Sequence, residues 1–134
     1  MKMIIKSFFG VSCLFLALIL IFVGGFHYTV NCKEILRDTS TSPDEKYELS
    51  LIEKGEPDWP FGPAHAKIAL KDKNGVISTH NFNVSNDGAT ISENNWTVFW
   101  KENCVQIIVN GEEQYDKLYT MHFDGTVEAE TIFS

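Results

Sequence analysis

The stretch that decides the fold is WTVFWKENCVQIIVNG, at residues 96–111. Bulky residues alternate over 96–100, which is the period-2 pattern of a half-buried strand. Residues 104–109 are nearly all β-formers, as expected of a central strand. The polar residues 101–103 predict a turn between the two runs, and the closing NG dipeptide is typical of a tight turn. The stretch therefore predicts an antiparallel hairpin followed by another turn.

Similar runs continue on both sides of this hairpin. Turn signals, several of them NG or DG pairs, recur roughly every 10–14 residues, which is typical of an antiparallel meander. Beyond the N-terminal segment we find no helical period, apart from a short helical turn expected near residues 92–94. We therefore expect an all-β domain, an antiparallel meander that forms a small sandwich or an open barrel. The further predicted strands cover residues 47–51, 66–71, 76–85, 118–123 and 126–133.

The N-terminal segment is strongly apolar. Between Lys6 and Lys33 lie 26 residues without Asp, Glu, Lys or Arg. A helix needs roughly 20 apolar residues to cross a bilayer core, whereas the core of a cleaved signal has about 7–15. We therefore expect residues 1–30 to form an uncleaved transmembrane helix. One alternative is a signal segment cleaved near Gly24 or Gly25, although there is no A-x-A pattern at that point. The other is lipid attachment at Cys32, although the residues before it are not the usual small ones.

The charges around this segment predict its orientation. Two lysines precede the apolar run, which by the positive-inside rule places the N-terminus in the cytoplasm, although Lys33 and Arg37 weaken the asymmetry. The chain would then be a single-pass protein of the cell membrane. Residues 31–44 are rich in Thr and Ser and predict a stalk. Residues 45–134 would form the extracytoplasmic β-domain.

The part of the chain after the apolar run is acidic. Two of the 11 basic residues precede the run, so nine basic residues face 18 acidic ones, a net charge near −9. Such a surface repels phosphate groups, which argues against nucleic acid and anionic lipid as partners. It favours solubility and would attract a basic protein partner.

The most distinctive loop is GEPDWPFGP, at residues 55–63. Its three prolines stiffen the chain at little cost in folding entropy. Trp59 and Phe61 are large apolar side chains, and exposed aromatics on a rigid loop are typical binding anchors. The alternative is that both rings fold inward and plug one end of the core. We take Asp58, Trp59 and Phe61 as candidate binding residues.

The sequence contains none of the common catalytic motifs. There is no G-x-S-x-G, P-loop, G-x-G-x-x-G or metal-type C-x-x-C. His65, His80 and His122 lie on or beside predicted strands, and we expect them to be scattered rather than gathered around a metal. We therefore expect no enzyme activity, no metal site and no cofactor.

Cys32 and Cys104 form a candidate disulfide, because both would face the oxidising side of the membrane. The bond would close a long loop and stabilise the fold by about 3–5 kcal/mol. The alternative is that Cys104 is a buried free thiol and that Cys32 is held out of reach near the membrane.

Several short motifs resemble those of a known group of proteins. SPDEKY at residues 42–47 opens the domain, Trp100 ends one strand, and residues 104–109 are followed by Asn110-Gly111. This layout resembles small membrane-anchored proteins of Gram-positive bacteria that have no established activity. The resemblance covers most of residues 42–111 and transfers no functional residues. The Pro-rich loop around Trp59 departs from the pattern, which has a shorter turn there.

These observations lead to one expected function and two alternatives. We expect a non-enzymatic, single-pass membrane protein whose extracytoplasmic β-domain binds or shields a protein or cell-envelope component at the cell surface. One alternative is an immunity-type protein that blocks a toxin with its acidic surface. The other is a small metal-dependent hydrolase that uses His65, His80 and His122.

Overall fold

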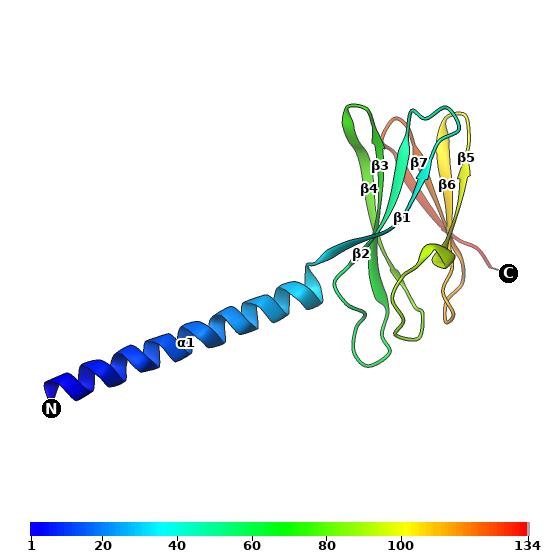
Figure 1. The fold of residues 1–134 in the computed structure, drawn as a ribbon. Coiled ribbons are helices and arrows are strands. Elements are labelled where there is room, and N and C mark those ends of the chain that lie inside the picture. The colour runs from blue at the N-terminus through cyan, green and yellow to red at the C-terminus, as the bar shows by residue number, and fades with distance from the viewer. Residues whose placement is uncertain (134) are drawn as a thin grey trace.

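The structure is a computed structural model that describes residues 1–133. A long N-terminal helix, α1 (Lys2–Asn31), is followed by eight strands in two four-stranded antiparallel sheets. Figure 1 shows the two sheets packed face to face, with the helix extending away on the side of the first sheet. The predicted all-β fold behind one apolar helix is confirmed, and the domain is a sandwich rather than an open barrel.

Each sheet is a simple meander in which consecutive strands are neighbours. The first sheet contains β1 (Glu34–Thr41), β2 (Glu48–Lys54), β3 (Ala64–Asp72) and β4 (Gly75–Val84). The second sheet contains β5 (Trp96–Trp100), β6 (Cys104–Val109), β7 (Lys117–His122) and β8 (Val127–Thr131). A short 3₁₀ turn, η1 (Glu93–Asn95), precedes the second sheet. The seven predicted strands and the predicted helical turn are confirmed.

The core lies between the two sheets and follows the period-2 alternation of the strands. In β6 every second residue is buried, as the alternation of an inward and an outward face requires. The apolar side chains that form the core come from the strands of both sheets and from the segment before η1, and none of them belongs to α1. The largest fully buried ones are Leu49, Leu51, Ile68, Leu70, Ile91, Ile107 and Met121.

The prediction of a stalk over residues 31–44 is wrong, because most of this segment forms strand β1. Its polar side chains have partners on the second sheet. The indole N–H of Trp96 donates to Asp38 Oδ2 at 2.7 Å, and that of Trp100 donates to Ser40 Oγ at 2.9 Å. A buried indole N–H needs an acceptor, so a polar edge strand suits these two tryptophans. The β-domain therefore begins at Glu34 and not at residue 45.

The helix has the length and composition of a membrane-spanning segment. Its apolar part, Lys6–Asn31, has 26 residues, and the apolar window within it is not buried by any other part of the protein. At about 1.5 Å per residue this part is roughly 39 Å long, which exceeds a hydrocarbon core of about 30 Å. A signal sequence has the same properties. Figure 1 shows that the helix runs across the strand direction, so the outer face of the first sheet lies on the helix side.

Candidate functional site

The junction between helix and sandwich is short and hydrogen bonded. Only Cys32 and Lys33 separate the end of α1 from the start of β1. The Glu56 N–H donates to the Val30 carbonyl at 2.8 Å, and the Gly55 N–H donates to the Lys33 carbonyl at 2.7 Å. Gly55 has a φ of +70°, and a Cβ at this position would overlap the Val30 carbonyl oxygen. The chain end of the helix is therefore fixed against the loop that follows β2.

The loop of residues 55–63 exposes its aromatic side chains. Backbone hydrogen bonds close it on itself, from Gly62 N–H to the Asp58 carbonyl at 2.7 Å and from Asp58 N–H to the Pro63 carbonyl at 3.1 Å. Trp59 is 92% exposed and Phe61 is 75% exposed. The alternative that these rings plug the core is therefore wrong. The three residues Trp59, Pro60 and Phe61 form an uncharged tip, which we call the aromatic tip.

Asp58 holds one side of this loop to the first sheet. Its Oδ1 lies 2.8 Å from His65 Nε2, and the other ring nitrogen of His65 lies 2.8 Å from Asn83 Oδ1. The hydrogen bond with Asp58 raises the pKa of His65 above its ordinary value; partial burial opposes this shift and Asn83 adds to it. Asp58 thus positions the loop, and its carboxylate is already engaged within the protein.

A hollow lies between the aromatic tip and the last turns of the helix. It is lined by Phe26 and Val30 of α1, by the aromatic tip and the three loop residues before it, and by Gly88 of the next loop, and has a volume of about 610 Å³. The three loop residues include the carboxylates of Glu56 and Asp58. Phe26 and Val30 are four residues apart and so share one face of the helix. The helix turns its apolar face toward the exposed aromatic residues of the loop.

The opposite end of the sandwich carries the SPDEKY motif. We call this the far end, and the end with residues 55–63 the near end. Residues 42–47 form the turn between β1 and β2, where the Ser42 hydroxyl donates to Asp44 Oδ1 at 2.7 Å and Tyr47 N–H donates to Ser42 Oγ at 3.0 Å. The hydrogen bonds that Asp44 accepts, first from the Ser42 hydroxyl and then from the Lys46 backbone N–H, lower the pKa of Asp44. The motif therefore closes the first hairpin instead of opening the domain.

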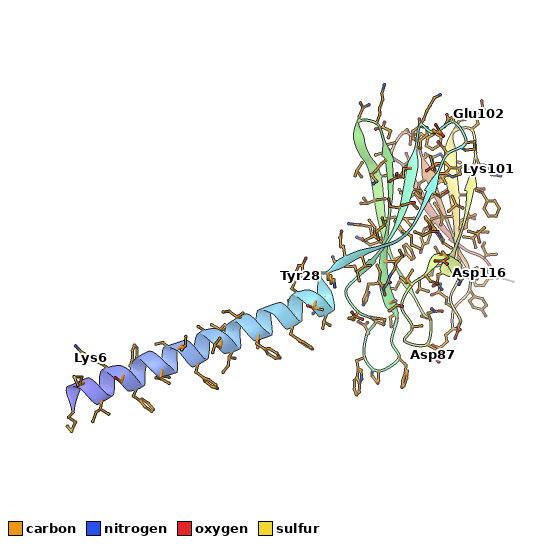
Figure 2. All side chains as sticks on the ribbon, viewed as in Figure 1. Lys6, Tyr28, Asp87, Lys101, Glu102 and Asp116 are labelled. Atoms are coloured by element: carbon orange, nitrogen blue, oxygen red, sulfur yellow. The ribbon has the colours of Figure 1, made fainter. Side chains whose placement is uncertain are left out.

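A second hollow, of about 660 Å³, lies at the far end beside this turn. Tyr47 forms part of its wall and stacks on Phe123, with ring centroids 3.9 Å apart. The remaining lining is mixed in charge. It consists of Thr41, Glu45, Lys46, Glu48, Lys71, Asp72 and Lys73. Figure 2 shows that Lys101 and Glu102 also lie at this end, and Asp87 at the other.

The three histidines of the hydrolase alternative are not gathered. His65 is held by Asp58 on the outer face of the first sheet, whereas His80 packs against Tyr119 with ring centroids 4.7 Å apart. His122 lies 3.4 Å from Glu128 on the second sheet. Within residues 1–133, no three His, Cys, Asp or Glu side chains are grouped so that they could hold a metal ion. The hydrolase alternative has no ligand set in the described part of the chain.

The candidate disulfide between Cys32 and Cys104 is not formed, and both residues are free thiols. Cys32 follows the helix at the near end. Cys104 lies at the far end, because its carbonyl accepts from Lys101 N–H and the neighbouring Trp100 bonds Ser40, eight positions beyond Cys32. A strand advances about 3.3 Å per residue, and a disulfide needs Cα atoms within about 7 Å. The strand length therefore keeps the two thiols apart.

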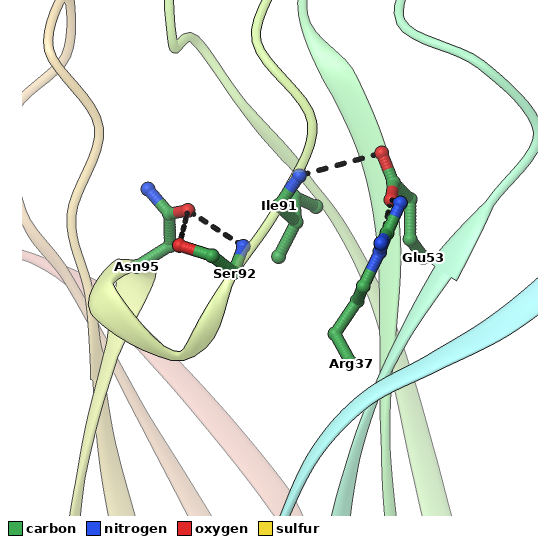
Figure 3. Close-up of polar contacts among 5 residues, drawn as sticks. All are labelled: Arg37, Glu53, Ile91, Ser92 and Asn95. Carbon is green, nitrogen blue, oxygen red and sulfur yellow. Dashed lines mark hydrogen bonds and ion pairs between the residues drawn. The ribbon is translucent and has the colours of Figure 1, made fainter.

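The structure contains a buried ion pair that was not predicted from the sequence. Glu53 is 1% exposed, and its carboxylate contacts Arg37 from the edge strand and accepts the Ile91 N–H at 3.3 Å. Figure 3 shows Glu53 between these two partners, near the Ser92–Asn95 contacts of η1. The signal was present in the sequence, because Glu53 follows Leu49 and Leu51 on the inward face of the same strand. The pair joins three segments at the near end, and its role is structural.

Comparisons of the chain with models of known protein families, with curated proteins and with solved structures find no match. The resemblance to small membrane-anchored proteins of Gram-positive bacteria therefore stays a prediction based on short motifs. Function has to be inferred from the helix, the two ends of the sandwich and their charges.

Proposed function

We propose that this chain is a single-pass membrane protein whose β-sandwich lies outside the cytoplasm and binds or shields a partner at the cell surface. The observation that carries the proposal is the junction: an apolar helix of 26 residues passes into an edge strand across two residues. The hydrogen bond from Glu56 to Val30 fixes this connection. Without a flexible stalk, the domain would be held directly against the membrane that contains the helix.

The far end is the surface that we propose for the partner. It lies at the other end of the strands from the helix junction and offers a hollow with an aromatic wall, Tyr47, surrounded by charges of both signs. Aromatic residues with mixed polar neighbours are typical of protein-binding surfaces. The mixed lining and the acidic domain fit a protein or a cell-envelope component better than a phosphate backbone.

We propose binding rather than catalysis, because the sequence lacks catalytic motifs and the described histidines do not converge. An immunity-type protein that blocks a toxin is a narrower form of the same proposal. Its support is the net negative charge of the domain, which would steer a basic partner toward it. A gene for a basic toxin next to the gene for this chain would favour this narrower form.

The membrane topology can be tested in cells that express the full chain. We expect the protein to stay in the membrane after alkaline extraction, and its intact mass to include the N-terminal segment. Protease added outside intact spheroplasts should remove the β-domain. A mature protein that begins after Gly25, or that alkaline buffer releases from the membrane, would contradict the proposal.

The binding surface can be tested by placing a photo-crosslinking amino acid at Lys73, in the far hollow. We expect defined adducts in whole cells that disappear when Lys46→Glu is added, because Lys46 lines the same hollow. The matched control carries the same crosslinker at Glu130, an exposed position on β8. Identical adducts from positions 73 and 130 would show that the far hollow has no specific partner.

A further inference from the structure

We propose that the aromatic tip, Trp59-Pro60-Phe61, inserts into the interfacial zone of the same membrane that α1 spans, and so acts as a second anchor to lipid. This inference rests on the proposed function, because it requires α1 to span a membrane. In this proposal the exposed loop contacts the headgroups and the upper acyl chains of the bilayer surface. The supporting observations are the position, the composition and the rigid attachment of the loop.

The position follows from the length of the helix. If Lys6 lies at the inner interface, a hydrocarbon core of about 30 Å is crossed in about 20 residues, at about 1.5 Å per residue. The outer boundary then falls near Phe26, and the helix continues to Asn31 within the outer interface. Phe26 and Val30 line one hollow together with Trp59, Pro60 and Phe61. The tip is therefore level with the part of the helix that reaches the outer membrane surface.

The composition of the tip matches that zone. Tryptophan is enriched where the bilayer meets water, because its ring is apolar and its N–H is polar. Trp59 is 92% exposed and Phe61 is 75% exposed, so their apolar surface has no cover within the protein. The adjacent carboxylate of Asp58 is paired with His65, which limits its repulsion from a lipid surface. Tyr28, also exposed, adds another aromatic side chain to the last turns of the helix.

The attachment keeps the tip beside the helix. The Glu56 N–H donates to the end of α1, and the Gly55 N–H donates to the residue before β1. Asp58 is hydrogen bonded to His65 on β3. On the other side, a Cβ at Gly88 would lie 2.8 Å from the Phe61 Cα, so the next loop packs closely against the tip. Membrane helices commonly tilt by about 20°, and a tilt toward the loop would bury the tip more deeply.

The test uses the full chain reconstituted in phosphatidylcholine vesicles. The chain has three tryptophans. The fluorescence of Trp59 is therefore obtained by subtracting the emission of Trp59→Phe from that of the wild type. We expect lipids with a nitroxide near the headgroup to remove most of this emission, and lipids with a nitroxide at the chain end to remove little. Aqueous iodide should quench it less in vesicles than in detergent-free, urea-unfolded protein. These results together would place the indole in the interface.

The matched control moves the reporter to the second sheet, in Trp59→Phe/Phe99→Trp. Phe99 is 43% exposed on β5, in the sheet farther from the helix, so its replacement should respond to iodide and not to nitroxide lipids. The lipid anchor would be overturned if the chain floats with the vesicles but Trp59 is quenched by iodide and not by nitroxide lipids, as the control is. The tip would then be available to a protein. A chain that does not float with the vesicles would overturn the membrane span and the anchor together.

Discussion

At the scale of single residues, the near end depends on polar groups that the core cannot leave unpaired. Glu53 points inward on β2 and would be an isolated buried charge without Arg37, whose Nε lies 2.5 Å from Glu53 Oε2. Its second oxygen accepts the Ile91 N–H, which links the first sheet to the segment before η1. Burying an unpaired carboxylate is expensive, so this pair is required once Glu53 is in place.

We predict that Arg37→Met lowers the free energy of unfolding by about 3–5 kcal/mol, because it leaves the Glu53 charge buried without its partner. Denaturant unfolding of the full chain in detergent measures the loss. The double variant Arg37→Met/Glu53→Met removes both charges and should recover most of the stability, apart from the cost of leaving the Ile91 N–H without its acceptor. If Arg37→Met unfolds at the same denaturant concentration as the wild type, the pair has no such role.

The bond between Asp58 and His65 predicts a pH dependence. Because the pKa of His65 is raised in the folded state, the stabilisation it gives is complete below the ordinary histidine pKa of about 6.5. It is lost as the pH rises through the higher, folded-state pKa. NMR titration of the His65 ring should show this pKa, and Asp58→Asn should lower it. Asp44→Asn at the far end is the matched control and should leave the His65 pKa unchanged.

The candidate binding residues were readable from sequence only as a loop of unusual composition. Three prolines around Trp59 and Phe61 indicated a stiff turn, but the same pattern fits a core plug and an exposed anchor. The choice depends on where the helix end and Gly88 lie, and these contacts join segments that are distant in sequence. The pairing of Asp58 with His65 was equally hidden, because it depends on how the loop folds back on β3.

At the scale of the elements, β1 shows why one strand was missed while seven were found. The seven have apolar faces whose alternation reports burial directly. β1 is polar, a bulge between Leu36 and Asp38 interrupts its register, and its partners Trp96 and Trp100 lie about 60 residues away. Its place in the sheet depends on these long-range hydrogen bonds, so local composition suggested a stalk instead.

The junction between α1 and β1 gives a prediction at this scale. Gly55→Ala should destabilise the domain by clearly more than the roughly 1–2 kcal/mol that a positive φ costs an alanine, because the new Cβ meets the Val30 carbonyl. Gly125→Ala is the matched control, since Gly125 has a φ of +98° but its nearest neighbour would be 3.7 Å away. Thermal unfolding of the full chain in detergent compares the two. Equal losses would show that the helix end is not held at Gly55.

At the scale of the whole molecule, the sandwich and the helix have separate roles. The described core contains side chains of both sheets and none of α1, so the helix contributes location rather than folding energy. The two parts are still joined by a hydrogen bond from the Glu56 N–H to the Val30 carbonyl. Removing the helix should therefore leave the core intact and loosen only the loop that carries the aromatic tip.

We predict that residues 32–134 fold without α1, with dispersed amide signals and a cooperative unfolding transition. The Glu56 amide loses its acceptor, so its hydrogen exchange should become faster than in the full chain in detergent. The Ala89 amide is the matched control, because it lies in the neighbouring loop and donates to the Asn86 carbonyl within that loop. Its exchange should not change.

An unfolded fragment would show that the helix is part of the folding unit. Equal Glu56 exchange with and without α1 would show that the helix does not hold the loop. The lipid anchor depends on that hold, because only a loop fixed to Val30 stays level with the membrane surface.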